Sequence, residues 1–390
     1  MNTSKLKSLI TGNIRQNGMV IALVLITVIF GFTTKFIIFR PMNISNLLMQ
    51  NSYLIFIAIG MFFCLNTGNV DLSVGSVVAV VGALVGWMTV TNKMSTPLAV
   101  VIAIVFGILV GVFQASFIAF LKVPPFIVTL AGMLIFRGLT FVILEGQTLS
   151  PFTDGFQYFA SGFVFTDLRV GGYNLMCLLL LVAAAIALIY GEISKRKTNI
   201  KYGIEVPPIP FTVLKVAAIL AFIAAIVLSL SAYKGLPFIF VVLILITLIY
   251  TFIANKTVIG RHVYAVGGNI DAAALSGVKT KWIMFMVYVN SAFLATISGL
   301  VVTGRLNAAT AKAGSGFELD AIAACLIGGV SASGGVGTTI AAIIGALVMA
   351  ILNNGMSIMG IGTDLQQVIK GFILLLAVTF DIFSKSKSGK

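Results

Sequence analysis

GRHVYAVGGNIDAAALSGVKTK, residues 260–281, is a polar, glycine-rich stretch of mixed charge between two long apolar segments. The 390-residue chain around it is 59% hydrophobic and only 9% charged, and its mean hydropathy is +1.12. Soluble domains carry about 25% charged residues, so the composition excludes a water-soluble fold. An internal hydrophilic stretch in such a chain is what a membrane protein presents to a soluble partner.

Long apolar runs on both sides of this stretch predict membrane helices. A run of about 18 apolar residues is long enough to cross the hydrocarbon core as a helix, and only helices and closed barrels satisfy their backbone groups in lipid. Because the runs are continuous rather than alternating, we expect one all-α, polytopic domain over residues 1–390, with about 10–12 transmembrane or membrane-entering helices. The predicted segments are 18–33, 47–67, 72–91, 97–121, 125–144, 172–190, 211–233, 236–254, 282–303, 319–330, 338–353 and 366–383.

The Lys and Arg residues predict the orientation of the chain. With the N-terminus inside and alternating segments, 16 of the 25 basic residues fall in inner loops and seven in outer loops, while Arg137 and Lys370 fall within spans. Cytoplasmic loops carry the excess of basic residues, so we expect both termini and the loops 191–210 and 255–281 to be cytoplasmic. The net charge of +14 thus sits mainly in loops, and we expect no nucleic-acid partner.

The sequence has no catalytic or metal-binding pattern. Cys64, Cys177 and Cys325 lie inside apolar segments without metal-type spacing, and His262 is the only histidine. We therefore expect neither an enzyme nor a bound metal or cofactor. The glycine-rich SASGGVGTT at 331–339 lacks the Lys of a phosphate-binding loop, so it is not expected to bind nucleotide.

Two charged residues at or inside apolar segments leave two interpretations open. Asp71, in NTGNVDLSVGS at 66–76, suits the N-cap of the following helix, or it lies near a permeation path or a dimer core. Arg137 lies inside the predicted helix 125–144. It either extends toward the outer interface near Glu145 or lines a polar cavity, because a charge inside a membrane needs protein or water around it.

Several uncharged polar residues lie within the apolar segments. Their usual role is hydrogen bonding between helices, and the alternative is contact with a polar solute. These candidates for a polar core or pathway are Asn66, Gln114, Asn290 and Asn353. The pairs Gly82/Gly86 and Gly107/Gly111 have the small-xxx-small spacing that favours close helix packing.

Five stretches, in order along residues 45–380, resemble the ribose/xylose-type permease family: NVDLSVGS, PPFIVTLAGM with FRGL, GRHVYAVGGNIDAAALSGV, GRLNAA and ELDAIAACLIGGVSASGGVGT. Its members are membrane subunits of bacterial ATP-binding-cassette (ABC) importers for monosaccharides. The resemblance implies the ABC importer permease fold, a bacterial inner-membrane location and a second permease subunit. It also implies an extracytoplasmic sugar-binding protein and a separate ATPase subunit, so that ATP is used by the partner and this chain needs no cofactor.

The resemblance makes 255–281 a cytoplasmic loop that couples to the ATPase. Its own residues predict a short helix at DAAAL (271–275), capped by Asn269 or Asp271, ended by Gly277 and entered through a turn at Gly267–Gly268. The candidate coupling residues are Gly260, Arg261, Gly267, Gly268, Asn269, Asp271, Ala272, Ala273, Leu275 and Gly277.

Two further regions of the chain indicate a partner protein and a branch of the family. The outer loop 304–320 carries Arg305, Lys312, Glu318 and Asp320, which we expect to meet a docking sugar-binding protein because charges at an interface rim steer association. We expect residues 172–233 to form an additional helical hairpin, which gives the chain a length typical of the xylose or multiple-sugar branch of the family. The alternative function is a secondary, ion-coupled transporter, which a lack of central Asp or Glu disfavours. A membrane enzyme is disfavoured by the missing catalytic groups.

Overall fold

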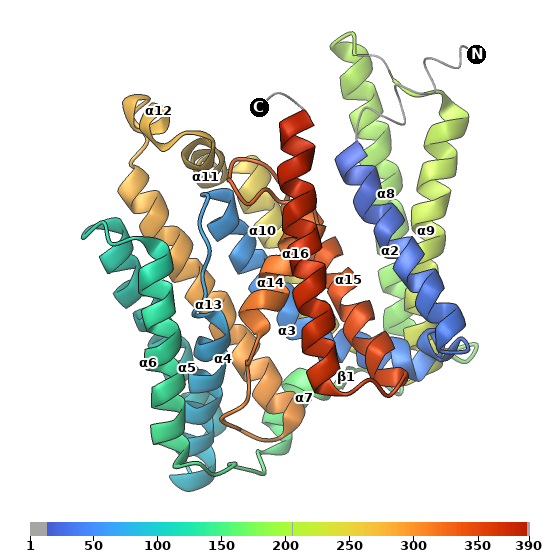
Figure 1. Ribbon diagram of the computed structural model, residues 1–390. Helices are drawn as coiled ribbons and strands as arrows, with labels where there is room; N and C mark the ends of the chain where they lie inside the picture. Colours follow the sequence, from blue (N-terminus) through green and yellow to red (C-terminus); the bar gives the residue numbers. More distant parts are fainter. Residues whose placement is uncertain (1–13, 205, 388–390) are drawn as a thin grey trace.

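The computed structural model describes residues 14–204 and 206–387, and within them the fold is an all-α bundle (Figure 1). Nine helices of this described part are long and apolar enough to cross a bilayer. They are α3 (Pro41–Asn66), α4 with the π-helical turn η2 (Val74–Gly86 and Trp87–Thr91), α5 (Thr96–Ala119), α6 (Pro125–Leu144), α8 (Leu175–Lys201), α9 (Ile209–Ala232), α10 (Phe238–Lys256), α13 (Thr280–Leu306) and α15 (Thr339–Ile358).

Three further helices complete the set of predicted segments. They are α2 (Ile14–Thr33), α14 (Phe317–Ile327) and α16 (Thr363–Lys387). Each of the twelve predicted apolar segments therefore coincides with a helix, and the all-α, polytopic fold is confirmed. α14 has 11 residues, so it enters the bundle but is too short to cross a bilayer.

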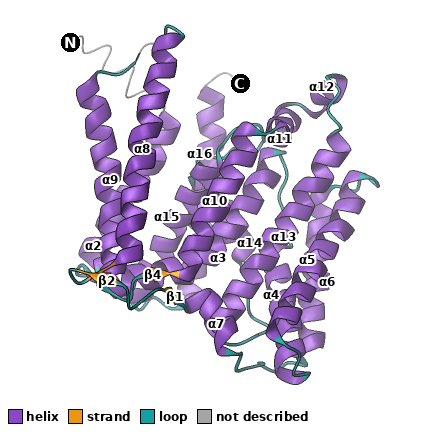
Figure 2. Cartoon of the chain, turned by 180° about the vertical axis from the view of Figure 1, so that it is seen from behind, coloured by secondary structure: helices purple, strands orange, loops and turns teal. Residues whose placement is uncertain are grey.

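Short elements lie at the two ends of the bundle. At one end, the start of α2, the end of α16 and the helices α11 (Val258–Gly268) and α12 (Ile270–Leu275) lie on the same side (Figure 1). The opposite end carries small strands and short helices (Figure 2). These are η1 (Ile37–Phe39), α7 (Asp154–Ser161), β1 (Phe163–Val164), paired with β4 (Leu236–Pro237), and β2 (Arg169–Val170), paired with β3 (Tyr173–Asn174).

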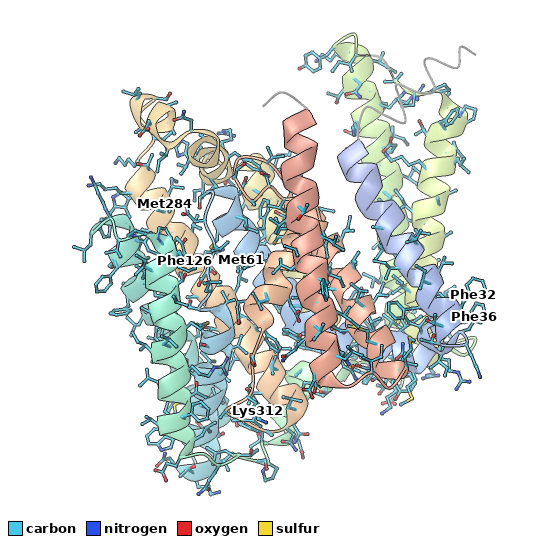
Figure 3. All side chains as sticks on the ribbon, in the orientation of Figure 1. Phe32, Phe36, Met61, Phe126, Met284 and Lys312 are labelled. Carbon is cyan, nitrogen blue, oxygen red and sulfur yellow. The ribbon has the colours of Figure 1, made fainter. Side chains whose placement is uncertain are left out.

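The core of the bundle lies around α3 and α13. In α3, 83% of the most apolar window is buried, compared with 6% in α8 and 11% in α9. Met61 and Met284 lie inside the bundle, whereas Phe32, Phe36 and Phe126 lie on its outside (Figure 3). The α8–α9 pair packs against α3 through α9 and leaves most of its surface exposed (Figure 2).

Glycines permit the closest helix contacts, as the small-xxx-small pairs predict. A Cβ at Gly107 would collide with Thr296, and one at Gly111 would crowd the backbone of Val289, so α5 approaches α13 closely. A Cβ at Gly82 of α4 would likewise collide with Thr303 of α13. Packing of this kind replaces the hydrophobic driving force that helices in lipid lack.

Two non-helical segments, one between α3 and α4 and one between α13 and α14, meet inside the bundle. The chain leaves α3 at Asn66 and starts the short α4 at Val74, and it leaves α13 at Leu306 and starts the short α14 at Phe317. α3 and α13 run in opposite directions (Figure 1). Gly75 and Gly314 lie so close that a Cβ on either would collide with the carbonyl oxygen of the other. The arrangement has the form of an inverted pair of broken helices, which was not visible in the sequence.

Two predicted loops are largely helical. α8 continues to Lys201, so half of the predicted loop 191–210 is helix. The stretch 255–281 contains α11, α12 and the start of α13. Both differences have the same reason: hydropathy marks where a helix leaves the apolar region, but Lys, Arg and Ala are strong helix formers that carry a helix on into water.

The contact between α14 and α15 gives a first prediction. A Cβ at Gly345 of α15 would collide with the carbonyl of Ala324 in α14, so Gly345→Ala should lower the melting temperature in detergent, at a cost of about 1–3 kcal/mol for overpacking. Gly191→Ala in α8 is the control, because nothing described lies within 4 Å of its Cβ position and Ala favours helix. An unchanged melting temperature for Gly345→Ala would contradict this packing.

Candidate functional site

The two short helices α11 and α12 form one element, residues 258–275, at the end of the bundle where α16 ends (Figure 1). Thr257 caps α11, where its hydroxyl accepts from the backbone N–H of Gly260 at 3.2 Å. Asn269, rather than Asp271, caps α12 and accepts from the N–H of Ala272 at 2.9 Å. Gly277 follows α12 with a positive φ of 84°, so the predicted short helix and its stop are present.

The α11–α12 element buries one face and exposes the other. Gly260, Val263 and Val266 of α11 are buried, and so is Ala273 of α12, at 5% exposure. Leu275 is 91% exposed at the tip of α12. The other candidate coupling residues with exposed side chains or backbone are Arg261, Gly268, Asn269, Asp271, Ala272 and Gly277. Ala273 therefore faces the bundle, and a bulky residue there would disturb the fold rather than probe the surface.

Gly267 joins α11 to two other segments. A Cβ at Gly267 would collide with the backbone oxygen of Asn66, the last residue of α3. The same Asn66 oxygen accepts from the N–H of Gly335 at 3.0 Å. Tyr264 donates from its hydroxyl to the carbonyl of Gly337 at 2.8 Å, and burial raises the pKa of Tyr264 above its ordinary value.

These contacts define a junction of three segments: α11, the end of α3 and the loop 328–338 after α14. The predicted turn at Gly267–Gly268 is wrong, because both glycines are the last residues of α11. Gly267 is required for a different reason, which is that only a residue without a Cβ can lie this close to another backbone. Displacing α11 would therefore displace both of the other segments.

Asp71 is the centre of a buried polar network between α3 and α4. It is 2% exposed. Its Oδ1 accepts from the N–H and Oγ of Ser73 at 2.9 and 2.6 Å, and its Oδ2 accepts from Ser291 Oγ in α13 at 2.7 Å. Ser73 Oγ also lies 3.1 Å from the side-chain oxygen of Gln114 in α5. Asp71 and Gln114 thus connect the break after α3 to α5 and α13.

The predicted N-cap role of Asp71 is wrong. The residue before α4 is Ser73, whose side chain makes no capping bond to the helix. Asp71 lies two residues further back, bonds the N–H of Ser73 and reaches across to α13. A buried carboxylate is costly unless its lone pairs are satisfied, and three donors to two oxygens satisfy it here.

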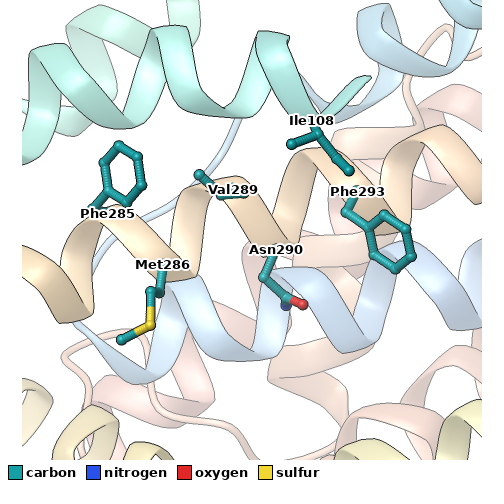
Figure 4. A pocket seen from close by; sticks show the side chains of 6 residues that line it. All are labelled: Ile108, Phe285, Met286, Val289, Asn290 and Phe293. Carbon is teal, nitrogen blue, oxygen red and sulfur yellow. The ribbon is translucent and has the colours of Figure 1, made fainter. Parts of the chain in front are cut away.

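Asn290 lines a hollow of about 310 Å³ between α5 and α13 (Figure 4). Its side-chain oxygen accepts from the hydroxyl of Tyr250 in α10. The other lining residues are apolar, and they are Ile108, Phe285, Met286, Val289 and Phe293. A single amide among apolar side chains suits lipid or a packed helix rather than a sugar, so the geometry assigns Asn290 to interhelical bonding.

The loop between α13 and α14 is held by a basic residue of α6. Arg137 Nη1 donates to the carbonyls of Ala311 and Ala313 at 3.0 and 2.6 Å. Arg137 therefore neither extends to Glu145 nor stands free in a cavity. It satisfies backbone oxygens that the helix break leaves unpaired, which is a common role for polar residues at broken membrane helices.

The four residues predicted for the outer face differ in exposure. Lys312 is exposed and Arg305 and Glu318 are partly buried, whereas Asp320 is 3% exposed. The prediction that Asp320 lies on an outer loop is wrong, because it belongs to α14 and pairs with Lys370 of α16, Nζ to Oδ2, at 2.8 Å. Asn353 of α15 lies close enough to Asp320 to interact with its carboxylate.

Sequence reasoning placed Lys370 inside a span but gave it no role. A charge inside an apolar helix needs a partner of opposite sign, and that rule was the signal available. The partner was not identifiable, since Asp320 lies 50 residues earlier in the chain.

The geometry defines a class: a membrane permease bundle with inverted broken helices, a buried polar centre and a helical element at one end. The chain belongs to the family described as branched-chain amino acid transport system / permease component, which matches residues 43–378. The resemblance to ribose/xylose-type permeases is confirmed by relatives of similar length.

The relatives that share 36% identity with the chain include two XylH proteins. One is the xylose transport system permease protein XylH of Haemophilus influenzae, over 98% of this chain and 99% of that one. The other is XylH of Escherichia coli, over 99% and 95%. The ribose import permease protein RbsC of Bacillus subtilis shares 35% identity over 88% of this chain and 85% of its own. No solved structure matches the chain.

The Asp71 network gives a second prediction. Ser291→Ala removes the donor to Asp71 Oδ2, and a buried acceptor without its partner costs about 1–3 kcal/mol, or more when charged. We therefore expect a lower melting temperature in detergent. Ser276→Ala, on the exposed end of the α11–α12 element, is the control and should melt as the parent does. Equal melting of all three proteins would show that the network contributes nothing to stability.

Proposed function

We propose that the chain is the permease subunit of an ABC importer for a monosaccharide, with a xylose-like sugar as its cargo. The observation that carries the proposal is the α11–α12 element, a rigid, partly apolar tip joined to the ends of α3 and α14. The relatives named for xylose and ribose transport support the class of cargo. The protein is a multi-pass protein of the bacterial inner membrane, with both termini in the cytoplasm.

The ATPase subunit docks on the α11–α12 element. Leu275 and Ile270 expose apolar surface on a segment that is otherwise polar, and an exposed apolar patch with a polar rim is typical of a protein interface. Because Gly267 lies against Asn66 and the loop 328–338, a movement of the ATPase would reach the helix breaks. The chain needs no nucleotide site of its own.

The opposite end of the bundle receives the sugar-binding protein. Lys312 is exposed on the loop before α14 (Figure 3), and Arg305 lies at the end of α13 nearby. Charges at the rim of an interface steer association. Glu318 and Asp320, which are partly or fully buried, belong to the interior and not to this docking surface.

A second copy of the permease completes the pathway. α16 packs chiefly against α14, and several of its exposed side chains are apolar. Its exposed apolar residues are Leu365, Val368, Phe372, Leu375 and Leu376. We assign this face to the partner permease in a homodimer, and the exposed faces of α8 and α9 to the lipid bilayer.

One finding favours the alternative of an ion-coupled transporter. The sequence was taken to lack a central acid, but Asp71 and Asp320 are both buried in the bundle. Coupled carriers use acids of this kind to carry protons or ions. Here Asp320 is paired with Lys370 and Asp71 is bonded by two serines, so both acids already have structural partners. The ABC importer remains the proposal.

The docking of the ATPase gives a third prediction. Leu275→Asp places a charge at the most exposed position of α12, and we expect it to abolish copurification with the ATPase and sugar uptake while leaving melting unchanged. Ile204→Asp, an exposed apolar residue in the loop between α8 and α9, is the matched control. If Leu275→Asp still binds the ATPase, the α11–α12 element is not the docking surface.

The orientation gives a fourth prediction. The native cysteines are buried, so their labelling background is low. Ser194→Cys and Ser276→Cys should react with an impermeant maleimide only in inside-out vesicles, because both lie on the proposed cytoplasmic side. Lys312→Cys should react in intact cells from which any outer barrier has been removed. The reverse pattern would invert the topology.

A further inference from the structure

A cavity of about 430 Å³ lies between α14, α15 and α16, away from the hollow at Asn290. Its size falls in the range of about 300–1,000 Å³ that is usual for small-molecule sites. Its polar lining residues are Ser315, Glu318 and Asp320 on the α14 side and Gln367 and Lys370 of α16, beside the apolar Leu319, Ala323 and Leu374.

The charges around the cavity balance among the described residues. Asp320 is paired with Lys370 at 2.8 Å, and Glu318 interacts electrostatically with Arg137. Lys370 has three N–H donors, of which Asp320 takes one, and its side chain is partly exposed. A wall with donors and acceptors but no net charge suits a neutral polyhydroxyl molecule. It suits an ion less well, since an ion would leave one sign of charge unmatched.

Two glycines keep the cavity open. No heavy atom of the described residues lies within 4 Å of a Cβ placed at Gly316 or at Gly371. Both residues line the cavity, so a side chain at either position would project into free space. Opposite them, Met349 of α15 supplies an apolar wall, which is the usual combination in a ligand pocket.

We propose that this α14–α16 cavity is a station on the sugar pathway, where Lys370, Asp320 and Gln367 contact the hydroxyls of a monosaccharide and Gly371 sets the size that passes. The proposal rests on the proposed function and deepens it. The permease then discriminates between sugars itself, in addition to the external binding protein.

The test uses the full importer in proteoliposomes, with ATPase and binding protein present, and measures uptake of radiolabelled D-xylose and D-glucose together with ATP hydrolysis. Gly371→Leu should lower uptake of both sugars about tenfold or more, because a single methylene group in a pocket already changes rates by about tenfold or more. Gly371→Ala adds only a methyl group, so it should lower uptake of the larger glucose more than uptake of xylose. ATP hydrolysis stimulated by the binding protein should persist in both variants. Gly191→Leu in α8 is the matched control and should behave as the parent.

The sugar-specific change is the decisive readout, because these variants leave the binding protein untouched. Lys370→Gln should likewise change the ratio of xylose uptake to glucose uptake. This variant leaves Asp320 charged and unpaired, so the double variant Asp320→Asn/Lys370→Gln, which removes both charges, shows the effect of losing the ion pair alone. Equal loss of both sugars together with lost hydrolysis would mean a structural role only and would overturn the proposal. An unchanged ratio in Gly371→Ala and Lys370→Gln would also overturn it. Failure of the parent importer to move any sugar would instead refute the proposed function.

Discussion

Within an apolar bundle every backbone N–H and C=O must find a partner inside the protein, and this chain breaks two of its central helices. The breaks are possible only because specific groups take over the lost bonds. Arg137 binds two carbonyls of the loop before α14, Asp71 binds the backbone N–H of Ser73, and Gly335 donates to Asn66. Arg137 and Asp71 are therefore explained first by the backbone groups that they satisfy.

α14 connects the polar cavity inside the bundle to the junction with α3 and α11. The first turn of α14 lies beside the cavity, which Asp320 lines. The loop after α14 carries Gly335 and Gly337, which contact α3 and α11. The 11 residues of α14 span about 16 Å at 1.5 Å per residue. A short helix with one end at the junction with α3 and α11 and the other at a polar cavity joins these two regions directly. Longer helices such as α13 are held along their whole length by close packing.

Hydropathy alone was enough to predict the helices, because each long apolar run has a single solution in lipid. It could not predict α11, whose apolar positions Val263 and Val266 stand among glycines and charges. It also placed Glu318 and Asp320 outside, since a carboxylate before an apolar helix usually marks the water boundary. Their burial depends on Lys370 and Arg137, which are far away in the sequence, and on a loop that turns back into the bundle. The cap at Asn269 was predictable because it depends on residues only three positions apart.

The low burial of the α8–α9 pair determines which substitutions these two helices tolerate. With 6% and 11% of their apolar windows buried, these helices make few contacts with the rest of the described chain. Exchanges among Leu, Ile, Val and Phe on their outer faces keep the hydropathy and disturb no packing, whereas the same exchanges in α3 leave cavities or clashes. Substitutions of this kind should therefore be tolerated better in the α8–α9 pair than in α3 and α13.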